Sequence, residues 1–295
     1  MPIADARGIQ IYYEDHGHPD DPAMLLVCGY TAQLTNWSDG FIDALVGQGF
    51  RVVCFDNRDA GLSEKTQQPS PDVATLLAKV AASDTDFDVP YTLSDMAGDA
   101  IALLDVLGIR QTHVAGSSMG GMIVQHLAIE HPSRVLSATS IMSTTGGSGV
   151  QPADPEVLAA LLAPPPADPE AAVEHAIEVN RLVSGPLWNR AEAEARTRGA
   201  IERSFHPTGA PFQMAAIVAS GDRTGRLATV DLPFLVIHGR ADSLIDVSSG
   251  YATAEAVPGA DLLVLDAMGH DLPTPLLPQI TDAIAGLARR QPFST

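Results

Sequence analysis

Short apolar segments alternate with stretches of helical periodicity along most of the chain. Residues 9–14 alternate apolar and polar side chains, as a half-exposed strand does. Six continuous apolar runs are typical of buried strands: 23–28, 51–56, 112–116, 136–142, 233–239 and 260–266. Helical spacing of apolar residues predicts helices at 92–108, 118–132 and 276–290. This alternation predicts an α/β fold whose mostly parallel central sheet is flanked by helices on both faces.

Residues 146–227 break this alternation. The segment opens with glycine, serine and proline, contains no clear buried strand, and is otherwise helical in pattern and rich in alanine and glutamate. Apolar residues recur within it, which favours a packed structure over a linker. We therefore expect a core formed by residues 1–145 and 228–295, with a helical cap inserted at 146–227.

Composition and charge exclude several classes of partner. The formal charge is −19, and such a surface repels both the nucleic-acid backbone and anionic membranes. No apolar run approaches the roughly 18–20 residues that span a bilayer, and the first residues do not resemble a secretory signal. We expect a cytoplasmic protein that acts on a small-molecule substrate, does not bind nucleic acid and has no membrane span; the sequence leaves its oligomeric state open.

The only cysteines, Cys28 and Cys54, lie in two of the apolar runs. Two cysteines are too few for a disulfide scaffold, and neither has further ligands at zinc-binding spacing along the chain. We expect buried free thiols, no metal and no cofactor.

The clearest chemical motif follows the strand predicted at 112–116. The pattern G-x-S-x-G is centred on Ser118, which has Gly116 and Gly120 two residues away; Ser117 lacks such glycines. At a sharp turn from strand to helix the central hydroxyl is exposed, and the neighbouring backbone comes too close for a Cβ. The turn also places Ser118 at a helix N-terminus, which favours developing negative charge. We predict Ser118 as a nucleophile; the alternative is a turn without chemistry.

Four features together resemble the α/β-hydrolase family over nearly the whole chain outside the cap. They are an oxyanion-type loop (LLVCGYT), a bracing loop (FDNRDAGLSE), the nucleophile turn (AGSSMGGM), and the paired loops VIHGRADSLI and DAMGHDLP. Within the family, the chain is similar to small-molecule carboxylesterases, including polyketide methyl esterases, and to cofactor-free haloperoxidase-like enzymes. The resemblance implies an α/β-hydrolase fold with a helical cap.

The resemblance also implies a catalytic triad in the order serine, acid, histidine. Ser118, Asp242 and His270 occupy these positions. His270 would accept the serine proton, and Asp242 would orient the imidazole. Asp246 is the rival acid, and its alternative role is to cap the helix that follows.

Two backbone N–H groups would form the oxyanion hole, those of Tyr30 and Met119. The sequence departs from the family in two places. Cys28 stands where many members have histidine, which puts the support of the oxyanion loop in question. Asp59 stands where glycine is common, which puts the geometry of the turn in the bracing loop in question.

A serine nucleophile excludes the aspartate-based members of the fold, such as dehalogenases. The predicted function is hydrolysis of small to medium, mostly apolar carboxylic esters through an acyl-enzyme. Alternatives are a thioesterase, lactonase, C–C hydrolase or haloperoxidase/perhydrolase with the same triad, and a receptor-like binding protein with little turnover. Predicted pocket residues are Trp37, Met122, Met142, Trp188 and Met268.

Overall fold

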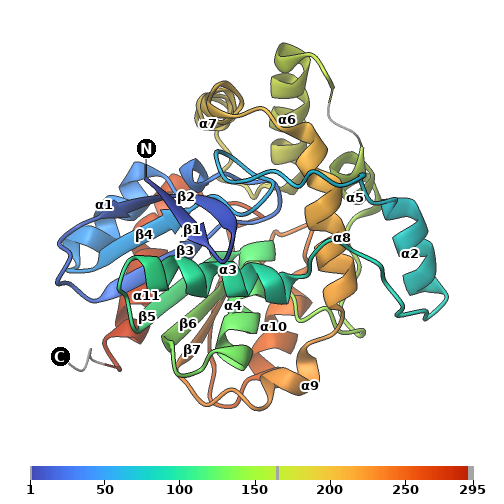
Figure 1. Ribbon diagram of the computed structural model, residues 1–295. Helices are drawn as coiled ribbons and strands as arrows, with labels where there is room; N and C mark the ends of the chain where they lie inside the picture. The colour runs from blue at the N-terminus through green and yellow to red at the C-terminus, as the bar shows by residue number, and fades with distance from the viewer. Residues whose placement is uncertain (1, 164–165, 292–295) are drawn as a thin grey trace.

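One eight-stranded sheet organises the protein (Figure 1). The computed structural model describes residues 2–163 and 166–291. The strand order is β1-β2-β4-β3-β5-β6-β7-β8; β1 and β2, and β2 and β4, pair antiparallel, and all other neighbours pair parallel. The predicted α/β fold with a mostly parallel sheet is confirmed. The strands are β1 (Ile3–Ala6), β2 (Ile9–His16), β3 (Ala23–Val27), β4 (Arg51–Phe55), β5 (Thr112–Ser117), β6 (Val135–Ile141), β7 (Phe234–Gly239) and β8 (Asp261–Leu265).

Helices cover both faces of the sheet, and each face has its own apolar cluster. On one face pack α1 (Asp39–Gly47) and α11 (Leu277–Ala288). On the other pack α3 (Leu93–Val106), α4 (Met119–Glu130) and α10 (Val247–Ala256). Within the described ranges, no helix combines the length and the apolar character needed to cross a bilayer.

The segment that breaks the alternation is helical. Its described residues form no strand, and in Figure 1 α6 and α7 lie together at one end of the molecule, away from the sheet. This arrangement is compatible with the predicted cap, whose boundaries stay a prediction. Its helices are α5 (Pro155–Leu162), α6 (Pro169–Val183), α7 (Arg190–Arg203), α8 (Ala210–Ser220) and the short α9 (Thr224–Leu227).

A repeated tetrapeptide starts two of these helices. The sequence Ala-Asp-Pro-Glu occurs twice, and in each copy the aspartate is the N-cap and the proline the first helical residue. The Asp154 side chain accepts a hydrogen bond from Glu156 N, and the Asp168 side chain accepts one from Ala171 N. Proline is favoured here because its missing N–H would be unpaired in any first turn.

Four elements have no counterpart among the predicted ones: β1, α1, α10 and α2 (Val73–Ala81). Three short 3₁₀ helices complete the described structure, at Leu34–Asn36, Pro207–Gly209 and Thr274–Leu276. Strand β1 is only four residues long and joins β2 through Arg7 and Gly8, both at positive φ. Such a short edge strand offers too few alternating positions to register as a pattern.

A buried histidine gives the fold a pH dependence that can be measured. His113 of β5 is bonded through Nδ1 to Ser137 Oγ at 2.8 Å, and burial lowers its pKa to about 4. The unfolded state therefore binds the extra proton first as the pH falls. We expect this group to stabilise the protein above about pH 6.5, with about 3 kcal/mol lost as the pH falls through about 4.

Denaturant unfolding measured across this pH range should show that the unfolding free energy falls less in His113→Gln than in the parent protein as the pH is lowered. The comparison is between the changes in unfolding free energy with pH, so a uniform cost of the substitution cancels. The same loss in both proteins would contradict this role for His113.

Candidate active site

The turn between β5 and α4 holds Ser118 in a strained backbone conformation. Its φ is 56° and its ψ is −122°, a backbone conformation that is energetically unfavourable for any residue other than glycine. The Ser118 N–H donates to Ile141 O at 2.9 Å, which ties the turn to β6. Although Ser118 is the N-cap of α4, its hydroxyl makes no capping bond. The hydroxyl is therefore available for other contacts.

The glycines of the motif are required by close backbone packing. A Cβ on Gly116 would collide with the carbonyl of Gly120, and a Cβ on Gly120 would collide with the carbonyl of Val27. A Cβ on Gly29, in the loop after β3, would lie 3.1 Å from Ser118 Cβ. The turn and this loop therefore lie against each other, and neither has room for side chains at these points.

Three residues from distant segments meet in one hydrogen-bonded chain. His270 Nε2 lies 2.9 Å from Ser118 Oγ, and His270 Nδ1 lies 2.8 Å from Asp242 Oδ2. An ionised carboxylate can only accept, so the Nδ1 of a neutral His270 carries the proton and Nε2 accepts from the serine hydroxyl. The side chain of Asp242 is fully buried, and that of His270 is 9% exposed. This is the arrangement needed for a serine activated by a general base.

The position of Asp242 is fixed by the backbone that follows it. Its Oδ1 accepts hydrogen bonds from Leu244 N at 3.0 Å and Ile245 N at 2.8 Å, which leaves Oδ2 for His270. Asp246, the rival acid, is instead the N-cap of α10 and accepts from Ser248 N at 2.9 Å. The geometry thus favours Asp242 as the partner of the imidazole.

The loop that carries His270 is attached to the end of α6. His270 N–H donates to Val183 O at 2.7 Å. Asp271 Oδ1 accepts from Gly269 N at 2.9 Å and from Gly185 N at 3.3 Å, so it bridges the same two segments. The position of the imidazole is therefore coupled to that of α6.

The two predicted oxyanion donors belong to segments that adjoin Ser118. Met119 is the first residue of α4, where an N–H has no partner within the helix, and Tyr30 follows Gly29 in the loop after β3. A Cβ on Gly29 would be 3.7 Å from Ser118 Oγ, so this loop borders the hydroxyl directly. The arrangement is compatible with the predicted roles of both N–H groups.

Cys28 supports the oxyanion loop where many family members have histidine. Its thiol donates to Gln33 O at 3.3 Å, and its carbonyl accepts from Asn57 Nδ2 at 3.0 Å. Burial raises the pKa of the Cys28 thiol well above its ordinary value, which keeps it a protonated donor. Further along the loop, Thr31 N donates to Gln213 Oε1 of α8 at 2.7 Å.

Asp59 takes the place of glycine without disturbing the bracing loop. Its φ is 65°, a region that aspartate tolerates better than most residues. Its carboxylate accepts from Thr66 N at 2.7 Å and from the Tyr91 hydroxyl at 2.7 Å. In the same loop, buried Asp56 pairs with Arg203 of α7 at 2.7 Å. These contacts make the loop a structural support.

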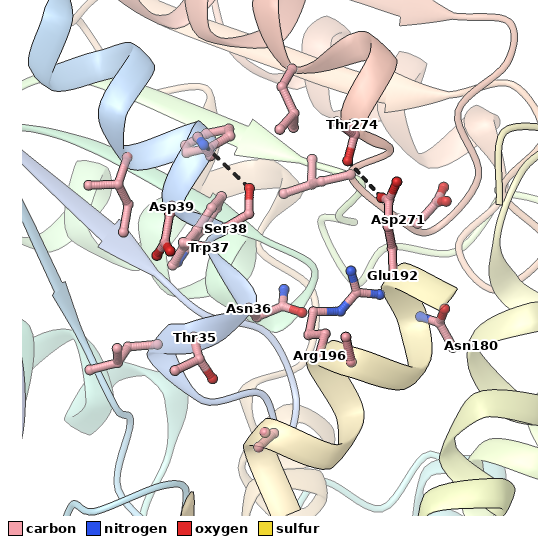
Figure 2. Close-up of a pocket in the computed structure, with 18 of the residues that line it drawn as sticks. Thr35, Asn36, Trp37, Ser38, Asp39, Asn180, Glu192, Arg196, Asp271 and Thr274 are labelled. Carbon is pink, nitrogen blue, oxygen red and sulfur yellow. Dashed lines mark hydrogen bonds between the residues drawn. The ribbon is translucent and has the colours of Figure 1, made fainter. Parts of the chain in front are cut away.

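His270 lines a cavity of about 590 Å³, whereas Ser118 is not among its lining residues. Figure 2 shows side chains that surround this cavity. Of the predicted pocket residues, Trp37 and Met142 line it. Trp188 lines a smaller neighbouring hollow, while Met122 and Met268 are buried in the two apolar clusters and line neither space. The lining mixes apolar side chains with many polar ones, so the cavity is more polar than expected from the sequence.

Arg196 is a functional candidate that the sequence pattern did not reveal. Figure 2 shows it extending from α7 between Asn36 and Glu192, and it is the only lysine or arginine among the lining residues. Burial lowers the pKa of Arg196 despite the nearby carboxylates of Asp271 and Glu192. Its guanidinium lines the cavity, and its N–H groups suit a hydrogen-bond acceptor on a ligand. Helical periodicity alone cannot tell which polar residue of a cap helix turns inward.

Comparisons with known proteins agree with the fold. A model of the alpha/beta hydrolase fold family matches residues 22–273. The chain is 27% identical to a rhodomycin D methylesterase from Streptomyces peucetius over 95% of both chains. It is 26% identical to a 2-hydroxymuconate semialdehyde hydrolase from Pseudomonas putida, over 85% of this chain and 88% of the relative. The structure resembles an enol-lactonase from Burkholderia xenovorans LB400, with a TM-score of 0.74, 20% identity, and coverage of 98% of this chain and 100% of that one.

Proposed function

Because the chain belongs to the α/β-hydrolase family, we propose that it is a serine hydrolase that cleaves carboxylic esters of small to medium size. The observation that carries this proposal is the hydrogen-bonded chain from Asp242 through His270 to Ser118, in which His270 lines a cavity of about 590 Å³. Likeness to a methylesterase over almost the full length of both chains supports an ester as the substrate.

The reaction proceeds in two halves. His270 Nε2 removes the proton of the Ser118 hydroxyl while Oγ attacks the ester carbonyl, and the N–H groups of Tyr30 and Met119 stabilise the oxyanion. The imidazolium then gives the proton to the departing alkoxide, which leaves an acyl-enzyme and an alcohol. Water, deprotonated by His270, attacks the acyl carbon, and the imidazolium returns this proton to Ser118 Oγ as the acid is released. Asp242 keeps the imidazole in the required tautomer throughout.

The cavity defines the kind of ester. Trp37, Phe41 and Met142 offer apolar walls, whereas Arg196 and Asn180 offer hydrogen-bond donors. We therefore expect a substrate with an apolar portion and at least one oxygen acceptor away from the scissile bond.

Substrate panels matched in size separate ester hydrolysis from the other reactions open to this triad. We expect kcat/KM to be highest for methyl or p-nitrophenyl esters and lower for thioesters, lactones, C–C substrates and peracid formation. A higher kcat/KM for one of the other classes would reassign the activity. No turnover of any class would favour a receptor-like binding protein.

Replacing Arg196 should affect binding of a substrate that carries a remote acceptor. For an aryl ester with a distal carboxylate or carbonyl, Arg196→Gln should raise KM about tenfold with little change in kcat, since a hydrogen bond to a charged group is worth about 1.5–3 kcal/mol. The same ester without the acceptor should be unaffected. The matched control is Arg198→Gln on the same helix, where Arg198 pairs with Glu170 on the surface. An equal effect on both esters would argue against this contact.

A further inference from the structure

A second cluster of chemically active side chains lies on the strands β2 and β4. His16 Nε2 is 3.5 Å from Glu14 Oε2 and 3.8 Å from Cys54 Sγ. One potential ligand atom from each residue lies within 4.8 Å of the others. We propose that Glu14, His16 and Cys54 form a binding site for a divalent transition-metal ion of the zinc type.

Strand register brings the three residues together. Glu14 pairs directly with Cys54 across the antiparallel β2–β4 ladder. His16 lies two positions after Glu14, so both side chains project from the same face of β2. Cys54 and His16 are 38 positions apart in the sequence. The sequence expectation of no metal site rested on local ligand spacing, which cannot detect ligands joined by strand pairing.

Two of the three ligand separations fit tetrahedral coordination. With Zn–N and Zn–O bonds of about 2.0–2.2 Å and a Zn–S bond of about 2.3 Å, ligand atoms stand about 3.3–3.7 Å apart. The nitrogen–oxygen and sulfur–nitrogen separations are already close to these values. The Glu14 carboxylate is 36% exposed and can turn toward the sulfur.

The donor set selects for a borderline-soft ion. Imidazole and thiolate favour zinc and similar ions, whereas Mg²⁺ and Ca²⁺ prefer oxygen ligands alone. A thiolate and a carboxylate would neutralise the two positive charges. The side chains of His16 and Glu14 are 35% and 36% exposed, which gives the ion an entry path and leaves room for a water as fourth ligand.

The protonation of the Cys54 thiol opposes metal binding. Burial, with the charges of Glu14 and Asp56, raises the pKa of the Cys54 thiol to about 12. The ion must therefore displace a proton from the sulfur. We accordingly expect micromolar affinity, weaker than that of a structural zinc site.

Titration of the full-length protein with CoCl₂ tests the proposal, because a cobalt–thiolate bond gives a charge-transfer absorption band. We expect this band to appear with one equivalent bound, to disappear on addition of ZnCl₂, and to be absent in Cys54→Ser. His16→Asn, at a half-exposed position, should weaken binding about tenfold or more without affecting folding. His18→Asn, two positions on and exposed, is the matched control and should bind as the parent protein does.

Absence of the band in the parent protein, or equal affinity in His16→Asn and His18→Asn, would overturn the site. The outcome is read from cobalt absorbance and not from turnover, and the variants change His16 and Cys54, which do not line the substrate cavity as Glu14 does. The proposal and the proposed function can therefore fail independently.

Discussion

Ser118→Ala is expected to lower kcat for ester hydrolysis by about 10⁴-fold or more while leaving the fold intact. Alanine removes the hydroxyl oxygen that lies 2.9 Å from His270 Nε2, and no acyl-enzyme can form. Thermal unfolding should change little, since the Ser118 hydroxyl makes no capping bond to α4. Steady-state kinetics on the preferred ester, with circular dichroism on the same samples, measure both effects.

Ser117→Ala is the matched control. Ser117 is the last residue of β5 and is 1% exposed, so its hydroxyl faces the protein interior. Its replacement should leave kcat within about tenfold of the parent value. Retained activity in Ser118→Ala together with loss in Ser117→Ala would reverse the assignment of the nucleophile.

Asp242→Asn is expected to lower kcat by about 10⁴-fold with little change in KM. The amide NH₂ cannot accept the Nδ1 proton, so His270 would change tautomer and present an N–H to Ser118 instead of a lone pair. The imidazole then no longer acts as a base. Kinetics on the same ester, with binding of a non-hydrolysable analogue, distinguish this loss from a loss of affinity.

Asp246→Asn provides a control with the same change of atoms four residues away. Asp246 caps α10, and asparagine caps helices about as well as aspartate does. Activity and stability should both stay near parent values. A large loss in Asp246→Asn with a small one in Asp242→Asn would show that the wrong acid has been assigned.

The buried parts of the fold were the most predictable from the sequence. All seven strands expected from apolar runs or from alternation are present, because a strand covered on both faces must be apolar along its length. The repeated Ala-Asp-Pro-Glu could also have placed the starts of α5 and α6, since each residue acts locally. Strand β1 and helix α2 lie at edges, where partial exposure weakens the pattern.

The site was predictable to different degrees. The glycines around Ser118 follow from backbone sterics that a sequence can express. Assigning Asp242 and His270 needed the family resemblance, because their approach to Ser118 depends on where three strands end. The pocket was the least predictable: Met142 lines the cavity, but Met122 and Met268 are buried in the core. Which way a methionine points is decided by packing between elements, on which periodicity carries no information.

Covalent labelling with an alkyl fluorophosphonate, followed by mass-spectrometric mapping of the modified residue, identifies the nucleophile. The reagent reacts with a serine only where a base activates the hydroxyl and N–H donors receive the phosphoryl oxygen. We expect a single adduct on Ser118, formed in step with loss of activity and much more slowly in Asp242→Asn. An adduct on any other residue, or full inactivation with Ser118 unmodified, would contradict the account.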